Sequence, residues 1–213
     1  MESEKTPWSE RAQETRERIL GAAVELMAAK GYAGTSVTEL CARAQVVRPV
    51  LYSHFGSKEG LLGAVVEHVG NSLIDELQQA YSRDQSADAS ERIKGAVLVY
   101  RRFIEERPER LRLLLLITLE RGQTSLEVRT AMARYQARAI QTIVSALEDT
   151  AGTEVEDLDT LAVTVVSILQ NAMVRRVFDP DSELTNRMWD ELARTVALGL
   201  GHRVRKLRAS KTP

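Results

Sequence analysis

The sequence predicts an all-α protein of about nine helices, and three observations support this fold class. First, no segment shows the sustained alternation of apolar and polar residues that a half-buried strand requires. Second, apolar residues recur at helical spacing through most of the 213 residues. Third, helix starts are marked where Ser, Thr or Asp precedes Glu by three residues, because such a pair caps free backbone amides. These pairs are Ser36/Glu39, Asp88/Glu91, Thr124/Glu127 and Thr153/Glu156.

The first four helices are predicted in the N-terminal third of the chain. Their expected ranges are 12–29, 37–44, 48–54 and a long fourth helix from Ser57 through at least Leu73. The first helix ends at Lys30-Gly31, because glycine accepts the left-handed conformation of a helix cap. The fourth helix is long enough to join two domains, which we expect at residues 1–62 and 63–213, with residues 1–10 as a disordered arm.

Five further helices are predicted in the C-terminal region. Their ranges are 89–107, 108–121, 125–150, 154–178 and 183–208. The helix at 154–178 is apolar on nearly all sides, so it has to be covered on two flanks. We therefore expect a homodimer in which helices 154–178 and 183–208 of both subunits form a four-helix interface.

Composition and charge narrow the possible functions. The 29 basic and 30 acidic residues nearly cancel, so the chain as a whole has no general signature for polyanion binding. Between Glu39 and Glu59, however, the charged residues are Arg43, Arg48 and Lys58, all of them basic. No apolar run is long enough to span a bilayer and no secretory signal precedes the first helix, so we expect a cytoplasmic protein without a membrane partner.

Cys41 is the only cysteine, which excludes an intrachain disulfide and leaves too few thiolates for a zinc site. It lies on the inward face of the second predicted helix, so we expect a small buried apolar residue rather than a redox sensor. The sequence contains no Ser/His/Asp or Cys/His arrangement, no glycine-rich phosphate loop and no metal-ligand cluster. We therefore expect no enzyme, no cofactor and no bound metal.

An ordered series of residues links the first four predicted helices. It comprises Gly31-Tyr32, Thr35-Ser36-Val37, Leu51-Tyr52-Ser53-His54-Phe55 and Ser57-Lys58-Glu59-Gly60-Leu61-Leu62. Through this series, residues 16–62 resemble the DNA-binding domain of the TetR (tetracycline-repressor) family of bacterial transcriptional regulators. The resemblance implies a three-helix helix-turn-helix domain and a larger C-terminal domain for dimerisation and for a small-molecule effector. It also implies a repressor that leaves a palindromic double-stranded DNA operator when the effector binds.

The third predicted helix is the expected recognition helix. Arg48 lies on its first turn, where a guanidinium can pair with O6 and N7 of guanine, while Pro49 and Val50 offer apolar surface to a thymine methyl group. Hydroxyls, backbone amides and cations near helix ends are expected to hold phosphate oxygens and to position the protein. The predicted DNA contacts are Thr35, Ser36, Val47, Arg48, Pro49, Val50, Tyr52, His54 and Lys58.

Three positions of the helix-turn-helix depart from the family pattern. Gln45 stands where glycine is usual, so a left-handed backbone is expected at a residue that adopts it at a cost. Val47 stands where Ser or Thr usually caps the helix, and the lost cap is worth about 1 kcal/mol. Pro49 replaces a frequent glycine without loss, because a first turn needs no amide donor there. The alternative to a DNA-binding regulator is a helical ligand- or protein-binding module that has lost DNA binding through Gln45 and Val47.

An effector pocket follows from the resemblance, and its lining is predicted from aromatic or polar residues set within apolar helices. The candidates are Tyr100, Phe103, Thr118, Tyr135, Gln170 and Asn171. Few charged residues lie on the inner helix stripes, which favours a hydrophobic or aromatic effector. The basic residues at 203–211 are expected to complement the dipole of the last helix and to stay solvated rather than to contact DNA.

Overall fold

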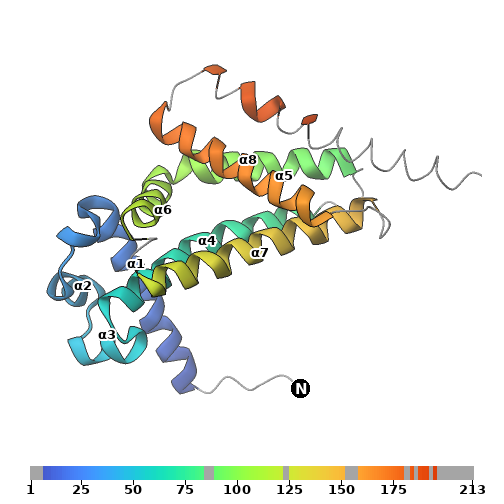
Figure 1. The fold of residues 1–213 in the computed structure, drawn as a ribbon. Coiled ribbons are helices and arrows are strands. Elements are labelled where there is room, and N and C mark those ends of the chain that lie inside the picture. Colours follow the sequence, from blue (N-terminus) through green and yellow to red (C-terminus); the bar gives the residue numbers. More distant parts are fainter. Residues whose placement is uncertain are drawn as a thin grey trace, which may run out of the picture. The chain divides into compact units, whose positions relative to one another are not determined.

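The structure is a computed structural model that describes residues 7–83, 89–121, 125–151, 158–179, 183–184, 187–191 and 194–195 (Figure 1). In these ranges α-helix is the only regular secondary structure, which confirms the predicted fold class. The helices are α1 (Pro7–Gly34), α2 (Val37–Ala44), α3 (Arg48–Phe55), α4 (Lys58–Arg83), α5 (Ala89–Glu106), α6 (Pro108–Arg121), α7 (Leu126–Ala151) and α8 (Leu158–Phe178). The stretches 183–184, 187–191 and 194–195 are also helical and fall within the last predicted helix.

Of the predicted cap pairs, Ser36/Glu39 is confirmed at the start of α2, while Asp88, Thr124 and Thr153 lie outside the described residues. At the start of α7 it is Ser125, one residue after the predicted cap, whose Oγ accepts from the Val128 amide at 3.3 Å. The start of α1 differs from the prediction. Residues 7–10 were expected in a disordered arm, but they form the start of α1, where a proline in the first turn costs no hydrogen bond. The predicted glycine break is confirmed at Gly31, whose φ of 73° interrupts α1 before a last helical stretch that ends at Gly34. The basic residues at 203–211 and the remaining part of the arm lie outside the described residues.

The chain divides into two compact units, and each is described here by itself. The N-terminal unit comprises Met1–Val69 and Arg112–Arg134, so it combines α1 to α3 with the first half of α4 and with parts of α6 and α7. The C-terminal unit comprises Gly70–Leu111 and Tyr135–Pro213. A division into folding domains at residue 62 stays a prediction.

The N-terminal unit has one apolar core to which six helices contribute. Its members are Ile19, Leu20, Ala22, Ala23, Val24, Met27 and Tyr32 of α1, Leu40, Cys41 and Ala44 of α2, Leu51 and Phe55 of α3, Leu61, Leu62, Val65, Val66 and Val69 of α4, Leu113, Leu114 and Ile117 of α6, and Val128 and Ala131 of α7. Cys41 is among these buried side chains, as predicted. Since Leu51 and Phe55 are the buried residues of α3, this short helix is held by one face only.

The C-terminal unit has a second core that contains three large aromatic side chains. Its members are Leu73, Val97, Tyr100, Phe103, Ile104, Ala162, Val165, Leu169, Ala172 and Trp189. In this unit α4 and α7 run parallel, because Asp75, Gln78 and Tyr81 bond in order to Arg138, Thr142 and the carbonyl of Ala146. None of the described helices is long and apolar enough to cross a membrane.

Candidate nucleic-acid interface

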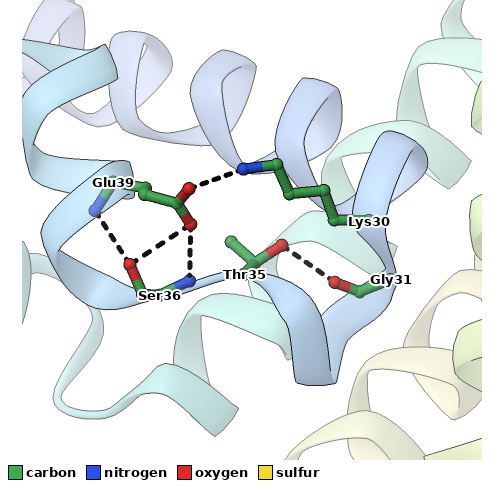
Figure 2. A network of polar contacts seen from close by, with 5 residues as sticks. All are labelled: Lys30, Gly31, Thr35, Ser36 and Glu39. Carbon is green, nitrogen blue, oxygen red and sulfur yellow. Dashed lines mark hydrogen bonds and ion pairs between the residues drawn. The ribbon is translucent and has the colours of Figure 1, made fainter.

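Helix α2 begins with a reciprocal cap between Ser36 and Glu39 (Figure 2). The Glu39 amide donates to Ser36 Oγ at 3.1 Å, and the Ser36 amide donates to Glu39 Oε2 at 3.2 Å. Lys30 Nζ of α1 donates to the other Glu39 oxygen at 2.5 Å. The bond from Lys30 and then the bond from the Ser36 amide lower the pKa of Glu39 below its ordinary 4.5. The start of α2 is therefore fixed to α1, and the Ser36 hydroxyl serves as the helix cap.

Thr35 lies immediately before this cap, but its hydroxyl is not available to a phosphate. The residue is 1% exposed, and its Oγ1 donates to the Gly31 carbonyl at 2.8 Å (Figure 2). Its amide donates to the Tyr32 carbonyl at 3.3 Å. Thr35 thus closes the chain after the break in α1, and the predicted phosphate contact through its side chain finds no support in this geometry.

The turn between α2 and α3 centres on Gln45, whose backbone is left-handed with φ 53° and ψ 49°. The predicted conformation is therefore confirmed. The amide of Gln45 donates to the Ala42 carbonyl at 3.3 Å, and the amide of Val46 donates to the Cys41 carbonyl at 3.0 Å. These bonds satisfy carbonyls at the end of α2, so they offset a left-handed strain of about 1 kcal/mol for a residue with a side chain.

Helix α3 has a buried face and an exposed face. Val47 is its N-cap residue and makes no side-chain cap bond, as the sequence predicted, and Pro49 lies in its first turn. Leu51 and Phe55 are buried, while Arg48, Pro49, Tyr52 and the 64% exposed Val47 face solvent. Val50 is half-buried. The predicted base-reading residues are thus close together at the N-terminal end of one short helix.

Arg48 is held by a residue that the sequence analysis did not identify. Its Nη2 donates to Oγ1 of Thr38 at 2.6 Å, and Thr38 lies on the first turn of α2. Both side chains are exposed. No sequence signal indicates this contact, because it joins positions ten apart across a turn whose geometry is set by Gln45.

Two other cations near Arg48 already have carboxylate partners. Arg43 pairs with Glu25 at 2.7 Å and Lys30 pairs with Glu39 at 2.5 Å. Within the described part of the chain, Arg48 has no carboxylate in ion-pair distance and only the neutral Thr38 hydroxyl as a partner. No described carboxylate therefore offsets its charge, so this guanidinium can attract an anion to the α2 and α3 surface.

Lys58 links the start of α4 to α1 and is also a partly exposed cation. Its Nζ donates to the Tyr32 carbonyl at 2.8 Å and lies 4.2 Å from the centre of the Tyr32 ring. The Tyr32 hydroxyl donates to Glu59 Oε1 at 2.6 Å. The start of α4 is therefore bound to the end of α1, and the ammonium group of the half-buried Lys58 retains further donors for a phosphate.

His54 lies at the far end of α3 and is half-buried, with its ring centre 6.0 Å from that of Phe55. The Arg16 guanidinium of α1 lies 4.8 Å from the centre of the Phe55 ring. His54 and Arg16 both line a groove of about 390 Å³ on the N-terminal unit, together with Glu67 and Arg134, which form an ion pair at 3.0 Å. His54 therefore borders the exposed face of α3 without sharing its full exposure.

The predicted effector residues are placed in several environments, and all of them except Thr118 belong to the C-terminal unit. Tyr100, Tyr135 and Gln170 line one cavity of about 30 Å³, which has room for about two waters. Phe103 is buried in the core, Asn171 is exposed on α8, and the side chain of Thr118 lies outside the described residues.

Two tyrosines give the cavity a neutral polar edge. The Tyr100 hydroxyl donates to the Leu169 carbonyl at 3.0 Å, and the Tyr100 ring lies 5.9 Å from that of Trp189. Burial, and then the nearby Tyr135, raise the pKa of Tyr100 well above its ordinary value, and burial also raises the pKa of Tyr135. The remaining lining is apolar, apart from Thr142 and Gln170, so the cavity suits an uncharged group.

Comparison with known proteins gives matches to transcriptional regulators. The family model "Bacterial regulatory proteins, tetR family" matches residues 19–65. The transcriptional repressor Rv3405c of Mycobacterium tuberculosis is 41% identical over 61 residues, which are 29% of this chain and 32% of that protein. The transcriptional activator FasR of Mycolicibacterium smegmatis is 35% identical over 101 residues, which are 47% of this chain and 45% of that protein. The matched segment thus spans less than half the length of either relative.

The fold is similar to solved structures over most of the chain. The transcriptional regulator FadR of Bacillus subtilis, in complex with stearoyl-CoA, has a TM-score of 0.69 and covers 85% of this chain and 97% of its own. Its sequence is 17% identical, so this likeness concerns the fold alone. The family-model match therefore bears on α1 to α4, and the structural match bears on the fold.

Proposed function

We propose that this chain, whose residues 19–65 match the family model of the TetR bacterial regulatory proteins, is a transcriptional repressor that binds a palindromic operator as a homodimer. A small-molecule effector bound in the C-terminal unit releases it from DNA. The observation that carries this proposal is the exposed face of α3, where Arg48 has no acidic partner among the described residues while the opposite face is anchored by Leu51 and Phe55. A short helix that is anchored on one face and has a cation without a described carboxylate partner at its start suits the major groove.

The proposed contacts on DNA fall into two groups. Arg48 reads guanine, and Val47, Pro49 and Val50 contact apolar base edges. Tyr52, His54, Lys58 and the exposed Ser36 border this surface and hold the phosphate backbone. Thr35 is left out of the proposal because its hydroxyl is buried and bonded to Gly31.

The proposed dimer uses the outer face of α8. Val163 and Ile168 are exposed there at 46% and 37%, while Ala162, Val165, Leu169 and Ala172 on the inner face are buried. Leu184, beyond α8, is also exposed. Apolar side chains exposed on one helix support an interface in which a second subunit buries them. A two-fold axis through this interface gives each subunit the same contact surface.

The proposed effector site is the cavity between Tyr100, Tyr135 and Gln170. Its volume of about 30 Å³ is far below that of a ligand pocket, so effector binding requires the surrounding helices to move apart. Such a movement would produce a second conformation of the protein. An effector that binds this conformation more tightly would lower the affinity for DNA. The FadR structure, with bound stearoyl-CoA, supports a ligand that carries a long apolar acyl chain.

Selection of bound DNA from a random pool tests this function. We expect a palindrome whose half-site centres lie about one helical turn apart or somewhat more, and an affinity that falls steeply with salt. A reporter gene behind the selected site distinguishes repression from activation, a distinction that matters because Rv3405c is named a repressor and FasR an activator. Binding without salt dependence or sequence preference would contradict the proposal.

The second candidate is a helical ligand- or protein-binding module that has lost DNA binding. It was motivated by Gln45 and Val47, which depart from the family pattern. In the structure both residues are accommodated: Gln45 adopts the left-handed conformation, and α3 forms behind an uncapped Val47. No observation on the described residues therefore favours this candidate over the first.

A further inference from the structure

Arg48 needs a fixed position if it is to read a single base pair. An arginine on a surface samples many rotamers, and this freedom is lost when the guanidinium docks on a base. The exposed Arg48 lies at the first position of α3, where neighbouring side chains of that helix do not enclose it. A residue outside α3 therefore has to restrict the guanidinium before DNA arrives.

Thr38 supplies that restriction from α2. Its Oγ1 accepts a hydrogen bond from Arg48 Nη2 at 2.6 Å. Threonine is β-branched and has two main χ1 rotamers in a helix, which limits the positions that its hydroxyl can take. The start of α2 is itself fixed by the bonds among Ser36, Glu39 and Lys30 (Figure 2). The position of the guanidinium thus depends on Thr38 and on the bonds that fix the start of α2 to α1.

The neutral character of the anchor is as important as its position. A carboxylate in place of Thr38 would compensate the charge of Arg48 and occupy two of its donors. The threonine hydroxyl takes one of the five N–H donors and leaves the cation uncompensated. Enough donors remain for a bidentate pair with guanine O6 and N7.

We propose that Thr38 is a positioning residue for base recognition, which holds the Arg48 guanidinium in the orientation that reads one base pair of each half-site. The proposal rests on the proposed function, because it assumes that Arg48 faces DNA. It makes discrimination at that base pair depend on a residue that does not itself contact the base.

A double-mutant cycle on the full-length protein tests this role. The ligand is the operator selected from the random pool by the unaltered protein, and the competitors carry each base at every position. The variants are Thr38→Val, Thr38→Ser, Arg48→Ala and the combination of Thr38→Val with Arg48→Ala. Thr130→Val, at an exposed position of α7, is the matched control for a lost surface hydroxyl.

We expect Thr38→Val to weaken operator binding roughly 3- to 10-fold and to reduce discrimination at one base pair of each half-site. Thr38→Ser should restore both values, since it keeps the hydroxyl. In the Arg48→Ala background the Thr38→Val change should have an effect of less than about 2-fold, because its partner is gone. Melting temperatures should stay unchanged, because Val and Thr are nearly isosteric and have similar helix propensities.

Two results would overturn the inference in distinguishable ways. If Thr38→Val weakens all DNA sequences equally, or if its effect persists undiminished with Arg48→Ala, then Thr38 does not act through Arg48 while the proposed function stands. If the unaltered protein shows no salt-dependent binding to any DNA, the proposed function fails and this inference fails with it.

Discussion

Helices α3 and α8 both expose apolar side chains, and the polar residues beside those side chains differ. On α3, Val47 and Tyr52 lie beside Arg48, which has no carboxylate partner in the part of the chain that the structure describes. The α3 surface therefore combines apolar contact area with an uncompensated positive charge, which is the combination that a polyanion with apolar base edges requires.

On α8, Val163 and Ile168 lie beside Thr164 and Ser167, whose hydroxyls both donate to carbonyls one turn earlier in the same helix at 2.8 Å. These hydroxyls are already satisfied, so they can be buried without an unpaired polar group. The comparison shows that exposed apolar area alone does not identify a partner. The hydrogen bonds and charges beside that area distinguish a surface suited to DNA from one suited to a second copy of the chain.

The largest expected effect comes from breaking the α8 surface. Val163→Asp combined with Ile168→Asp should raise the dimer dissociation constant at least ~100-fold, because charges would be buried without partners. Binding to a palindromic operator should weaken in parallel, since two half-sites are no longer linked. Sedimentation velocity over a concentration series measures the first effect, and a fluorescence anisotropy titration with DNA measures the second.

Leu126→Asp is the matched control for this pair. Leu126 is an exposed leucine of α7 in the N-terminal unit, so it tests an apolar-to-acidic change away from α8. The control should leave the oligomeric state unchanged. An unaltered sedimentation profile for the double variant on α8 would contradict a dimer interface on this surface.

The next effect comes from removing the charge on α3. Arg48→Ala should weaken operator binding roughly 10- to 100-fold and abolish the preference for guanine at one position of each half-site. Arg43→Ala removes a cation that is already paired with Glu25, so it should change affinity less than about 3-fold. Equal losses in the two variants would mean that the uncompensated charge is not what distinguishes α3.

A smaller effect concerns the turn that sets the angle of α3. Gln45→Gly should raise the free energy of unfolding by about 0.5–1 kcal/mol, because glycine relieves the left-handed strain but adds freedom to the unfolded chain. Urea denaturation followed by circular dichroism measures this change. Gln45→Ala is the control, since it keeps a Cβ at the strained position and should give no gain. A loss of stability with glycine would mean that the Gln45 side chain stabilises the fold by more than its left-handed backbone costs.

The smallest effect is the pH dependence of the α2 cap. The pKa of Glu39 is lowered in the folded protein, so its charge stabilises the fold above its ordinary value of 4.5 and this contribution is lost as the pH falls through the folded value. Glu39→Gln retains a capping side chain and removes the charge. The unaltered protein should be more stable than this variant near pH 7, and the difference should shrink below pH ~4.5. A difference that does not change with pH would assign the effect to the cap alone.

Local features of the fold followed from the sequence because their causes are local. The Ser36 and Glu39 cap, the break at Gly31 and the left-handed Gln45 each depend on residues within one helical turn. The first turn of α1 was missed because Pro7 was read as part of an arm, although proline is suited to that position.

The contacts that define the candidate site could be predicted only in part. Thr35 was expected to face a phosphate, but the break at Gly31 turns its hydroxyl back to the end of α1. The bonds of Arg48 to Thr38 and of Lys58 to the Tyr32 carbonyl join different helices. Such contacts depend on how the helices cross, and hydrophobic periodicity fixes which face is buried but not the angle of crossing.

The burial of Cys41 has a practical consequence for measuring whether a ligand changes the spacing of the two α3 helices in the proposed dimer. Cys41 is packed in the core of the N-terminal unit, where a thiol is protected from alkylating reagents. A second cysteine introduced at an exposed position such as Ser53 would therefore accept a maleimide dye or a nitroxide selectively, with the native thiol left in place. Pulsed electron paramagnetic resonance between two such labels, one on each copy of the chain, would report the spacing of the two α3 helices with and without a ligand.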